Sequence, residues 1–119
     1  MIKAYVLYPN KDDVIFDFDY YCNKHVPMIG ELLGEAVKGA TVDAGVASVV
    51  PGEAAPYVAI STISFESLES FQTAFGPNAE KIKTDVPNFT NTAPTIQLCE
   101  QKYKPSVFKC ENKQDTNSQ

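Results

Sequence analysis

Side chains and motifs that would identify a cofactor or metal protein are scarce in this chain. Its 119 residues include one histidine and three cysteines, Cys22, Cys99 and Cys110, which show no CxxC spacing. One imidazole without partners rarely makes a metal site, so we expect no metal and free, reduced thiols. The sequence also lacks GxGxxG, GxxxxGK(S/T) and GxSxG motifs, which argues against a nucleotide-binding loop and a nucleophile elbow. We therefore expect no cofactor.

Positive charge and long apolar runs are also scarce. Ten basic and fifteen acidic residues leave a net charge of −5, and there is no basic run. We therefore expect neither nucleic acid nor an anionic membrane as a partner. The longest apolar runs fall far short of the ~20 residues that cross a bilayer. The N-terminal residues lack the features of a signal peptide, so a cytoplasmic location is the default expectation.

The hydrophobic pattern predicts a single domain over residues 1–100. Hydrophobic residues make up 44% of the chain, which is typical of a globular protein. The predicted order of elements is strand, helix, strand, strand, helix, strand. This order is typical of an α+β ferredoxin-like sandwich (βαββαβ), a four-stranded antiparallel sheet with helices on one face. The predicted strands are 2–8, 38–50, 57–65 and 95–100, and the helices follow residues 17 and 67.

The signals at the ends of the predicted helices are clear. Asp17 or Asp19 can cap the first helix, and Gly34 fits its C-terminal stop. Pro27 lies inside this helix and removes one backbone donor, so we expect a kink there. Ser67 is predicted to cap the second helix.

The single histidine lies on the apolar stripe of the first helix. His25 comes three residues after Cys22 and four before Ile29, which is helical spacing. The one side chain that titrates near neutral pH is therefore predicted to face inward. Either it satisfies a buried hydrogen bond as a core histidine, or it lines a pocket. Cys22 can be read as a partner of His25 or as a buried inert thiol, and the second interpretation is favoured.

The strands predict an assembly as well as a fold. Strands 2–8 and 57–65 carry apolar residues on both faces, which indicates burial of both faces. A bare apolar sheet face is unusual on a monomer, and pairing two sheets in a symmetric homodimer removes it. Residues 101–119 are predicted to be a C-terminal extension that docks through residues 103–110 and ends in a polar tail.

Three stretches of the chain resemble the EthD family of dimeric α+β barrel proteins. The most specific runs from Asp19 to Met28, with a tyrosine pair, His25 and Pro27; the others are residues 5–10, and 71–77 with 85–91. The resemblance implies a ferredoxin-like protomer and a homodimer that packs two sheets together. It implies little about activity, because the family is named after a component linked to degradation of a fuel ether and has no established reaction. Members are sometimes labelled reductases, but this chain has no flavin or nicotinamide motif.

The resemblance and the inward histidine together lead to a functional hypothesis. In this fold a cavity can lie between the sheet and its helices, and His25 would act there as a general acid/base on a small apolar or aromatic molecule. Relatives with the wider barrel fold suggest cyclisation, dehydration or cofactor-free oxygenation, but fold analogy does not choose among them. The alternatives are a non-enzymatic binding or accessory protein of a catabolic pathway, and a structural dimer with a filled core and no cavity.

Other candidates for ligand contact lie near His25 in the predicted fold. For the tyrosines the plainer interpretation is core packing with the hydroxyl at the surface, and for the asparagines it is turn formation. Asp43 is the nearest candidate for a second inward titratable group, which would strengthen the enzyme hypothesis. The candidate ligand-binding residues are Tyr5, Tyr8, Tyr21, Asn88 and Phe89.

Overall fold

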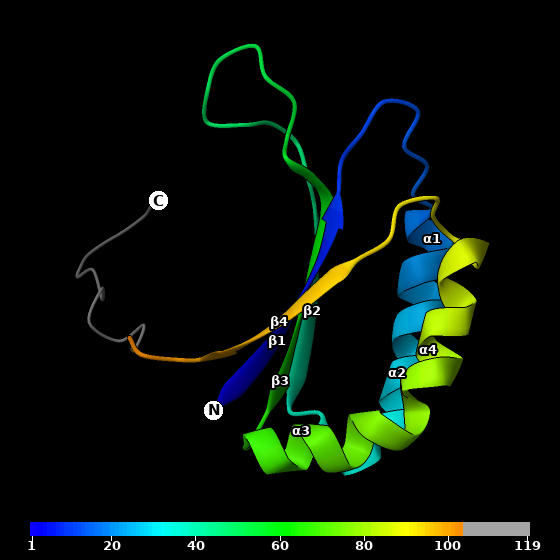
Figure 1. The fold of residues 1–119 in the computed structure, drawn as a ribbon, viewed down its shortest axis with the longest axis vertical. Helices are drawn as coiled ribbons and strands as arrows, with labels where there is room; N and C mark the ends of the chain where they lie inside the picture. The colour runs from blue at the N-terminus through cyan, green and yellow to red at the C-terminus, as the bar shows by residue number, and fades with distance from the viewer. Residues whose placement is uncertain (104–119) are drawn as a thin grey trace, which may run out of the picture.

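The computed structural model describes residues 1–103, which form a four-stranded antiparallel sheet with helices on one face (Figure 1). The strand order is β2-β3-β1-β4. The α+β sandwich predicted from the order of elements is confirmed. The strands are β1 (Ile2–Pro9), β2 (Gly39–Ala44), β3 (Tyr57–Phe65) and β4 (Thr95–Glu100).

The helical layer has two arms that lie against the same side of the sheet (Figure 1). The first follows β1 and the second follows β3, and α2 contacts α3. The first arm consists of α1 (Phe18–Tyr20), the π-helical η1 (Tyr21–His25), α2 (Val26–Leu33) and η2 (Gly34–Ala36). The second consists of α3 (Leu68–Phe75), η3 (Gly76–Asn78), α4 (Ala79–Asp85) and η4 (Val86–Asn88).

The ends of the helices are set by the residues that the sequence indicated. The Asp17 carboxylate accepts a hydrogen bond of 3.0 Å from the Tyr20 backbone N–H, and the Ser67 hydroxyl accepts one of 3.1 Å from Ser70. Each satisfies a donor that has no partner within the first helical turn. Gly34 ends α2 with a φ of 59°, a conformation that glycine adopts without steric strain.

Alternation along the strands decides which side chains face the helices. On β3, Ala59, Ser61, Ile63 and Phe65 are all buried, whereas the residues between them are half-buried. The residues of β1 that lie beside them in register include Ala4, Val6 and Tyr8. These two central strands therefore supply the sheet side of the core, because a strand presents every second residue to one face.

The predicted second strand is too long. We expected residues 38–50, but β2 ends at Ala44 and residues 45–56 form a loop. Gly45 approaches the Tyr57 carbonyl so closely that a Cβ atom would clash there, and the loop is then turned by a hydrogen bond from Glu53 to the Val50 carbonyl. Val49 is fully exposed in this loop, because β3 begins only at Tyr57 and offers it no paired strand.

The inward stripe of the first helix also differs from the prediction. Cys22 is exposed, whereas Tyr21, His25, Ile29 and Leu33 are buried at steps of four residues. The prediction that Cys22 is a buried thiol is therefore wrong, and its exposed position also argues against a Cys22–His25 pair. Cys22 belongs to the π-helical segment η1, and its side chain faces solvent rather than the sheet.

The C-terminal extension lies almost entirely outside the described residues. Of the predicted docking segment 103–110 only Tyr103 is described, and the predicted polar tail is not. Cys22 and Cys99 are free thiols, as expected, whereas Cys110 also lies outside. Within residues 1–103 no helix has the length and hydropathy needed to cross a membrane.

Candidate functional site

His25 is placed by an irregular turn of the first helical arm. The Val26 N–H donates to the carbonyl of Tyr21, five residues earlier, so η1 has π-helical bonding. Pro27 has no N–H to offer the Asn23 carbonyl, which is the disruption that the sequence predicted near this residue. Single π-helical turns inside α-helices occur frequently at functional sites. Tyr21 and His25, the first and last residues of the turn, are both buried, and their rings stack with centroids 5.2 Å apart.

His25 is paired with a carboxylate from the other helical arm. Its Nδ1 lies 2.8 Å from Oδ2 of Asp85, the last residue of α4. The exposed fractions of the two side chains are 2% and 16%. An ionised carboxylate only accepts hydrogen bonds, so Nδ1 carries a proton, and in the neutral form of the ring the lone pair is on Nε2. No group within residues 1–103 hydrogen-bonds to Nε2.

The carboxylate of Asp85 is held by two further donors. Its Oδ1 accepts hydrogen bonds from the Tyr20 hydroxyl at 2.8 Å and from the Asn88 side-chain amide at 2.9 Å. Burial alone would raise the pKa of Asp85, but the hydrogen bonds from His25, Asn88 and Tyr20 and the charge of the imidazole outweigh it and lower this pKa. Asp85 therefore stays ionised at neutral pH and holds the imidazole in one tautomer.

A second buried polar group lies beside the histidine. The Tyr21 hydroxyl and the Ser61 hydroxyl are 2.5 Å apart, and the Tyr8 phenol hydrogen-bonds to Tyr21. Burial, together with the interactions with Tyr21, raises the pKa of Tyr8 far above its ordinary value. Burial also raises the pKa of Tyr21, although its hydrogen bonds to Ser61 and Tyr8 act in the opposite direction. Both phenols are therefore neutral and act as hydrogen-bonding groups rather than bases.

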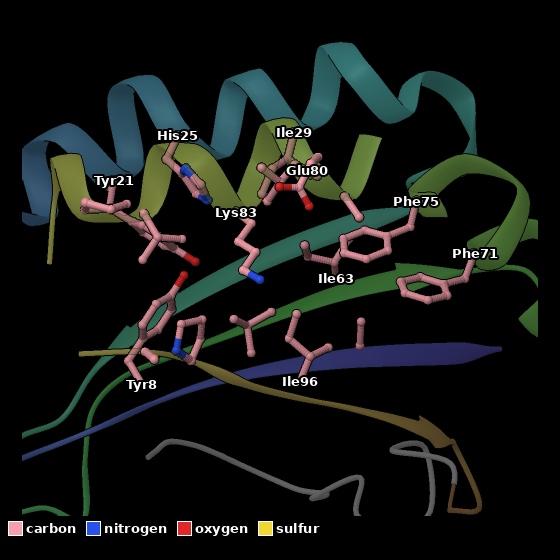
Figure 2. A pocket seen from close by; sticks show the side chains of 18 of the residues that line it. Tyr8, Tyr21, His25, Ile29, Ile63, Phe71, Phe75, Glu80, Lys83 and Ile96 are labelled. Atoms are coloured by element: carbon pink, nitrogen blue, oxygen red, sulfur yellow. The ribbon is translucent and has the colours of Figure 1, made fainter. Parts of the chain in front are cut away.

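A cavity of about 580 Å³ lies between the sheet and the helices, and His25, Tyr8 and Tyr21 line one end of it (Figure 2). Its volume is in the range of small-molecule sites. The structural dimer with a filled core predicted no cavity, and the structure contradicts that alternative. The rest of the wall is mainly apolar and includes Ile29, Ile63, Phe65, Phe71, Phe75 and Ile96.

The predicted ligand-contact residues fall into three groups. Tyr8 and Tyr21 line the cavity with His25, and their hydroxyls face each other inside it rather than the surface (Figure 2). Phe89 is buried against the imidazole, with ring centroids 4.6 Å apart, and Asn88 supports Asp85. Tyr5 alternates with the cavity-lining Ala4 and Val6, so it lies on the opposite face of the sheet and is not near His25.

Asn91, which also follows Phe89 in this loop, and Asp43 are not part of the site. Asn91 ties down a loop, because its amide accepts from the Ile15 N–H and donates to the Asp13 carbonyl. This is the turn-forming role that was the plainer interpretation. Asp43 is exposed and lies beside Ile60 in the register of β2 and β3, on the face away from the helices. Asp43 was the nearest candidate for a second inward titratable group, and its outward position rules it out.

Asp85 is the residue that the sequence reasoning missed. It follows the buried Ile82 by three residues and precedes Val86, so helical spacing would have placed it toward the first helical arm. It also belongs to the stretch 85–91 that carries the family resemblance.

Within residues 1–103 there is no group of three or more His, Cys, Asp and Glu side chains that would hold a metal ion.

A comparison with known protein families identifies the family of this chain. The sequence model of the EthD domain matches residues 16–93. The chain belongs to the EthD family. The match includes Tyr21, His25, Ser61 and Asp85, so the buried polar groups of the site, Tyr8 excepted, lie within the shared domain.

Solved structures similar to this EthD-family protein show the same fold. An EthD-like protein from Ralstonia eutropha JMP134 is 34% identical with a TM-score of 0.83, and the match covers 89% of this chain and 96% of that one. An EthD family protein from Bacillus halodurans C-125 is 21% identical with a TM-score of 0.62, covering 86% and 99%. A protein from Arabidopsis thaliana is 17% identical with a TM-score of 0.56, covering 87% and 96%. No curated protein matches the chain.

Proposed function

We propose that this EthD-family protein binds a small, mainly apolar or aromatic metabolite in the cavity, and that His25 acts on it as a general acid/base without a cofactor. The observation that carries the proposal is the imidazole that borders an apolar cavity while Asp85 holds its Nδ1. Perturbed titratable groups that converge on an apolar pocket are the usual mark of a ligand site.

The geometry supports proton transfer in both directions. Nε2 of His25 would take a proton from an acidic C–H or O–H of the ligand, and Asp85 would stabilise the imidazolium that forms. The same imidazolium would then return the proton to a leaving oxygen or to a carbon. The Tyr8 phenol lies in the same end of the cavity and would donate to a ligand oxygen that gains charge. Cyclisation and dehydration both need these two steps, and cofactor-free oxygenation needs the first.

A non-enzymatic role as a binding or accessory protein is the second candidate. It is favoured by the satisfied pair of His25 and Asp85, which is also what a purely structural core would contain. The two functions differ in what the loss of the imidazole does. An enzyme without His25 would still bind its ligand but would no longer convert it.

The experiment that tests the proposal is an NMR titration of the His25 ring, without ligand and then with a panel of aromatic and polyketide-like compounds. We expect at least one compound to shift the ring resonances, and we expect His25→Asn to abolish its conversion while the fold is retained. A ring that ignores every compound, or a folded His25→Ala variant with full affinity and turnover, would contradict the proposal.

The homodimer remains part of this proposal. On the face of the sheet away from the helices, Tyr5, Leu7, Val58 and Ile60 are apolar and only half-buried within one protomer. Packing two such faces together would remove them from water. Sedimentation should therefore show a dimer, and Leu7→Asp should shift it toward monomer, whereas a monomeric wild-type protein would contradict this assembly.

A further inference from the structure

Two charged side chains, Glu80 and Lys83 of α4, stand among the apolar residues that line the cavity. Figure 2 shows the Lys83 amine directed from the helix toward the sheet, whereas the Glu80 carboxylate stays close to the helices. Both side chains are exposed, so they mark the edge of the cavity that solvent reaches. The ion pairs within residues 1–103 join His25 to Asp85 and Lys102 to Glu100, so Lys83 has no carboxylate partner there.

We infer that the ligand of this cavity carries an acidic group, a carboxylate or an acidic enol, which pairs with Lys83 at the mouth while its apolar body lies inside. The inference rests on the proposed function and adds the chemical class of the ligand. An ammonium group at the rim of a low-dielectric cavity interacts more strongly with an anion than one on an open surface. The chain as a whole has a net charge of −5 and repels anions, so a local cation is needed to admit an acid.

The interior supports the same orientation. At the end away from His25, the rings of Phe71 and Phe75 stack with centroids 5.0 Å apart. They offer an aromatic surface for the body of the ligand. Lys83 lies two residues before Asp85 and Glu80 lies five before it, so Lys83 is closer along α4 to the partner of the histidine. An acid held by Lys83 would therefore extend its body toward Phe75 and keep the atoms next to the charged group close to His25.

The competing outcome is a preference for a cationic ligand, because the Glu80 carboxylate also lines the cavity. Glu80 precedes Lys83 by three residues and would favour a cationic ligand if its carboxylate decided the selectivity. The test therefore compares three probes with the same aromatic body: 2-naphthoic acid, 2-naphthamide and 2-naphthylmethylamine. Affinities are measured by calorimetry on the full chain, at low and at high salt.

We expect the acid to bind about five- to tenfold more tightly than the amide, with the amine weakest, and we expect salt to reduce the preference for the acid. Lys83→Met should remove that preference by weakening the acid while leaving the amide unchanged, and Lys83→Arg should keep it. Lys81→Met is the matched control, because Lys81 is an exposed lysine of the same helix that does not line the cavity.

The outcomes separate this inference from the proposed function. Equal binding of acid and amide, a preference for the amine, or an acid preference that survives in Lys83→Met overturns the acidic-ligand inference but leaves the cavity as a binding site. If none of the probes and none of the compounds in the NMR panel binds, the proposed function fails and the inference fails with it.

Discussion

Two groups of side chains lie between the sheet and the helices, one at each end, and they differ in polarity. At one end, Ile29, Leu33, Phe65 and Ile82 form a cluster of buried apolar side chains. At the other end, Tyr21 and Phe89 pack against the imidazole of His25, and the Tyr8 ring packs against both of them. The apolar end gains stability from the area that it removes from water, and the aromatic end is stable only if its buried polar atoms find partners.

The difference between the ends begins on one strand. β3 presents Ala59, Ser61, Ile63 and Phe65 in turn to the helices, and the single hydroxyl among them lies below Tyr21. Two residues further along, the same face carries only hydrocarbon. One strand therefore serves a core and a site at the same time, because successive inward positions are only about 7 Å apart. The following predictions test whether the two ends respond as differently as this composition requires.

The largest effect is expected at the apolar end. Phe65→Ala removes a ring with 0% exposure and should lower the free energy of unfolding by about 3–5 kcal/mol. Urea denaturation measures the change. Phe71→Ala is the matched control, because Phe71 is half-buried at the cavity and should cost clearly less. Equal costs for the two variants would mean that the half-buried ring of Phe71 is packed as tightly as the fully buried ring of Phe65.

At the aromatic end, the pair of His25 and Asp85 should show energetic coupling. Removing either partner leaves the other without its hydrogen bond in a largely buried position, so His25→Ala and Asp85→Ala should be less destabilising together than the sum of the single variants. We expect a coupling energy of about 1–3 kcal/mol in a double-mutant cycle of unfolding free energies. The variant pair His25→Ala and Glu80→Ala, which breaks no contact between the two residues, should be additive.

The lowered pKa of Asp85 predicts how stability depends on pH. Between the folded and the unfolded pKa of this carboxyl, the unfolded chain binds more protons, so stability rises with pH in that window. The contribution should be complete above the ordinary carboxyl range of about 4 and should be lost as the pH falls through the lower folded pKa. Asp85→Asn should flatten this part of the profile in denaturation experiments, and an unchanged profile would show that other carboxyls decide acid stability.

The smallest effect is expected for the buried hydroxyl pair. Tyr21→Phe leaves the ring in place but removes a hydrogen-bond partner of the Ser61 and Tyr8 hydroxyls, and it should lower the free energy of unfolding by about 1–2 kcal/mol. Adding Ser61→Ala should return part of this loss, because no buried hydroxyl of the pair is then left without a partner. A second loss of the same size on adding Ser61→Ala would contradict the pairing.

Most of the fold was predictable because it depends on local and periodic signals. The caps Asp17 and Ser67, the stop at Gly34 and the alternation of the central strands are properties of short stretches, and each is confirmed. The second strand was predicted too long because Val46, Val49 and Val50 have high strand propensity. Propensity cannot show that β3 begins too late in the sequence to pair with them.

The candidate site was predictable only in part. The helical spacing of His25 indicated an inward side chain, and Tyr8 and Tyr21 were correctly placed near it. Helical spacing failed for Cys22, because the π-helical turn changes which side chains of this segment face inward. Tyr5 was wrongly expected near His25, although strand alternation itself puts it on the face opposite Tyr8. Asp85 was missed because its partner is 60 residues away in the chain, where no local pattern connects the two.

The sequence by itself determined the order of elements, the family and the inward position of the only histidine, because hydrophobic periodicity and capping act over a few residues. Only the tertiary structure decided that Asp85 meets His25, that Tyr8, Tyr21 and Ser61 share a buried hydrogen-bonded group, and that a cavity remains beside them. These features depend on how two helical arms are docked on one sheet face. Docking is set by the summed packing of many side chains rather than by any one stretch of sequence.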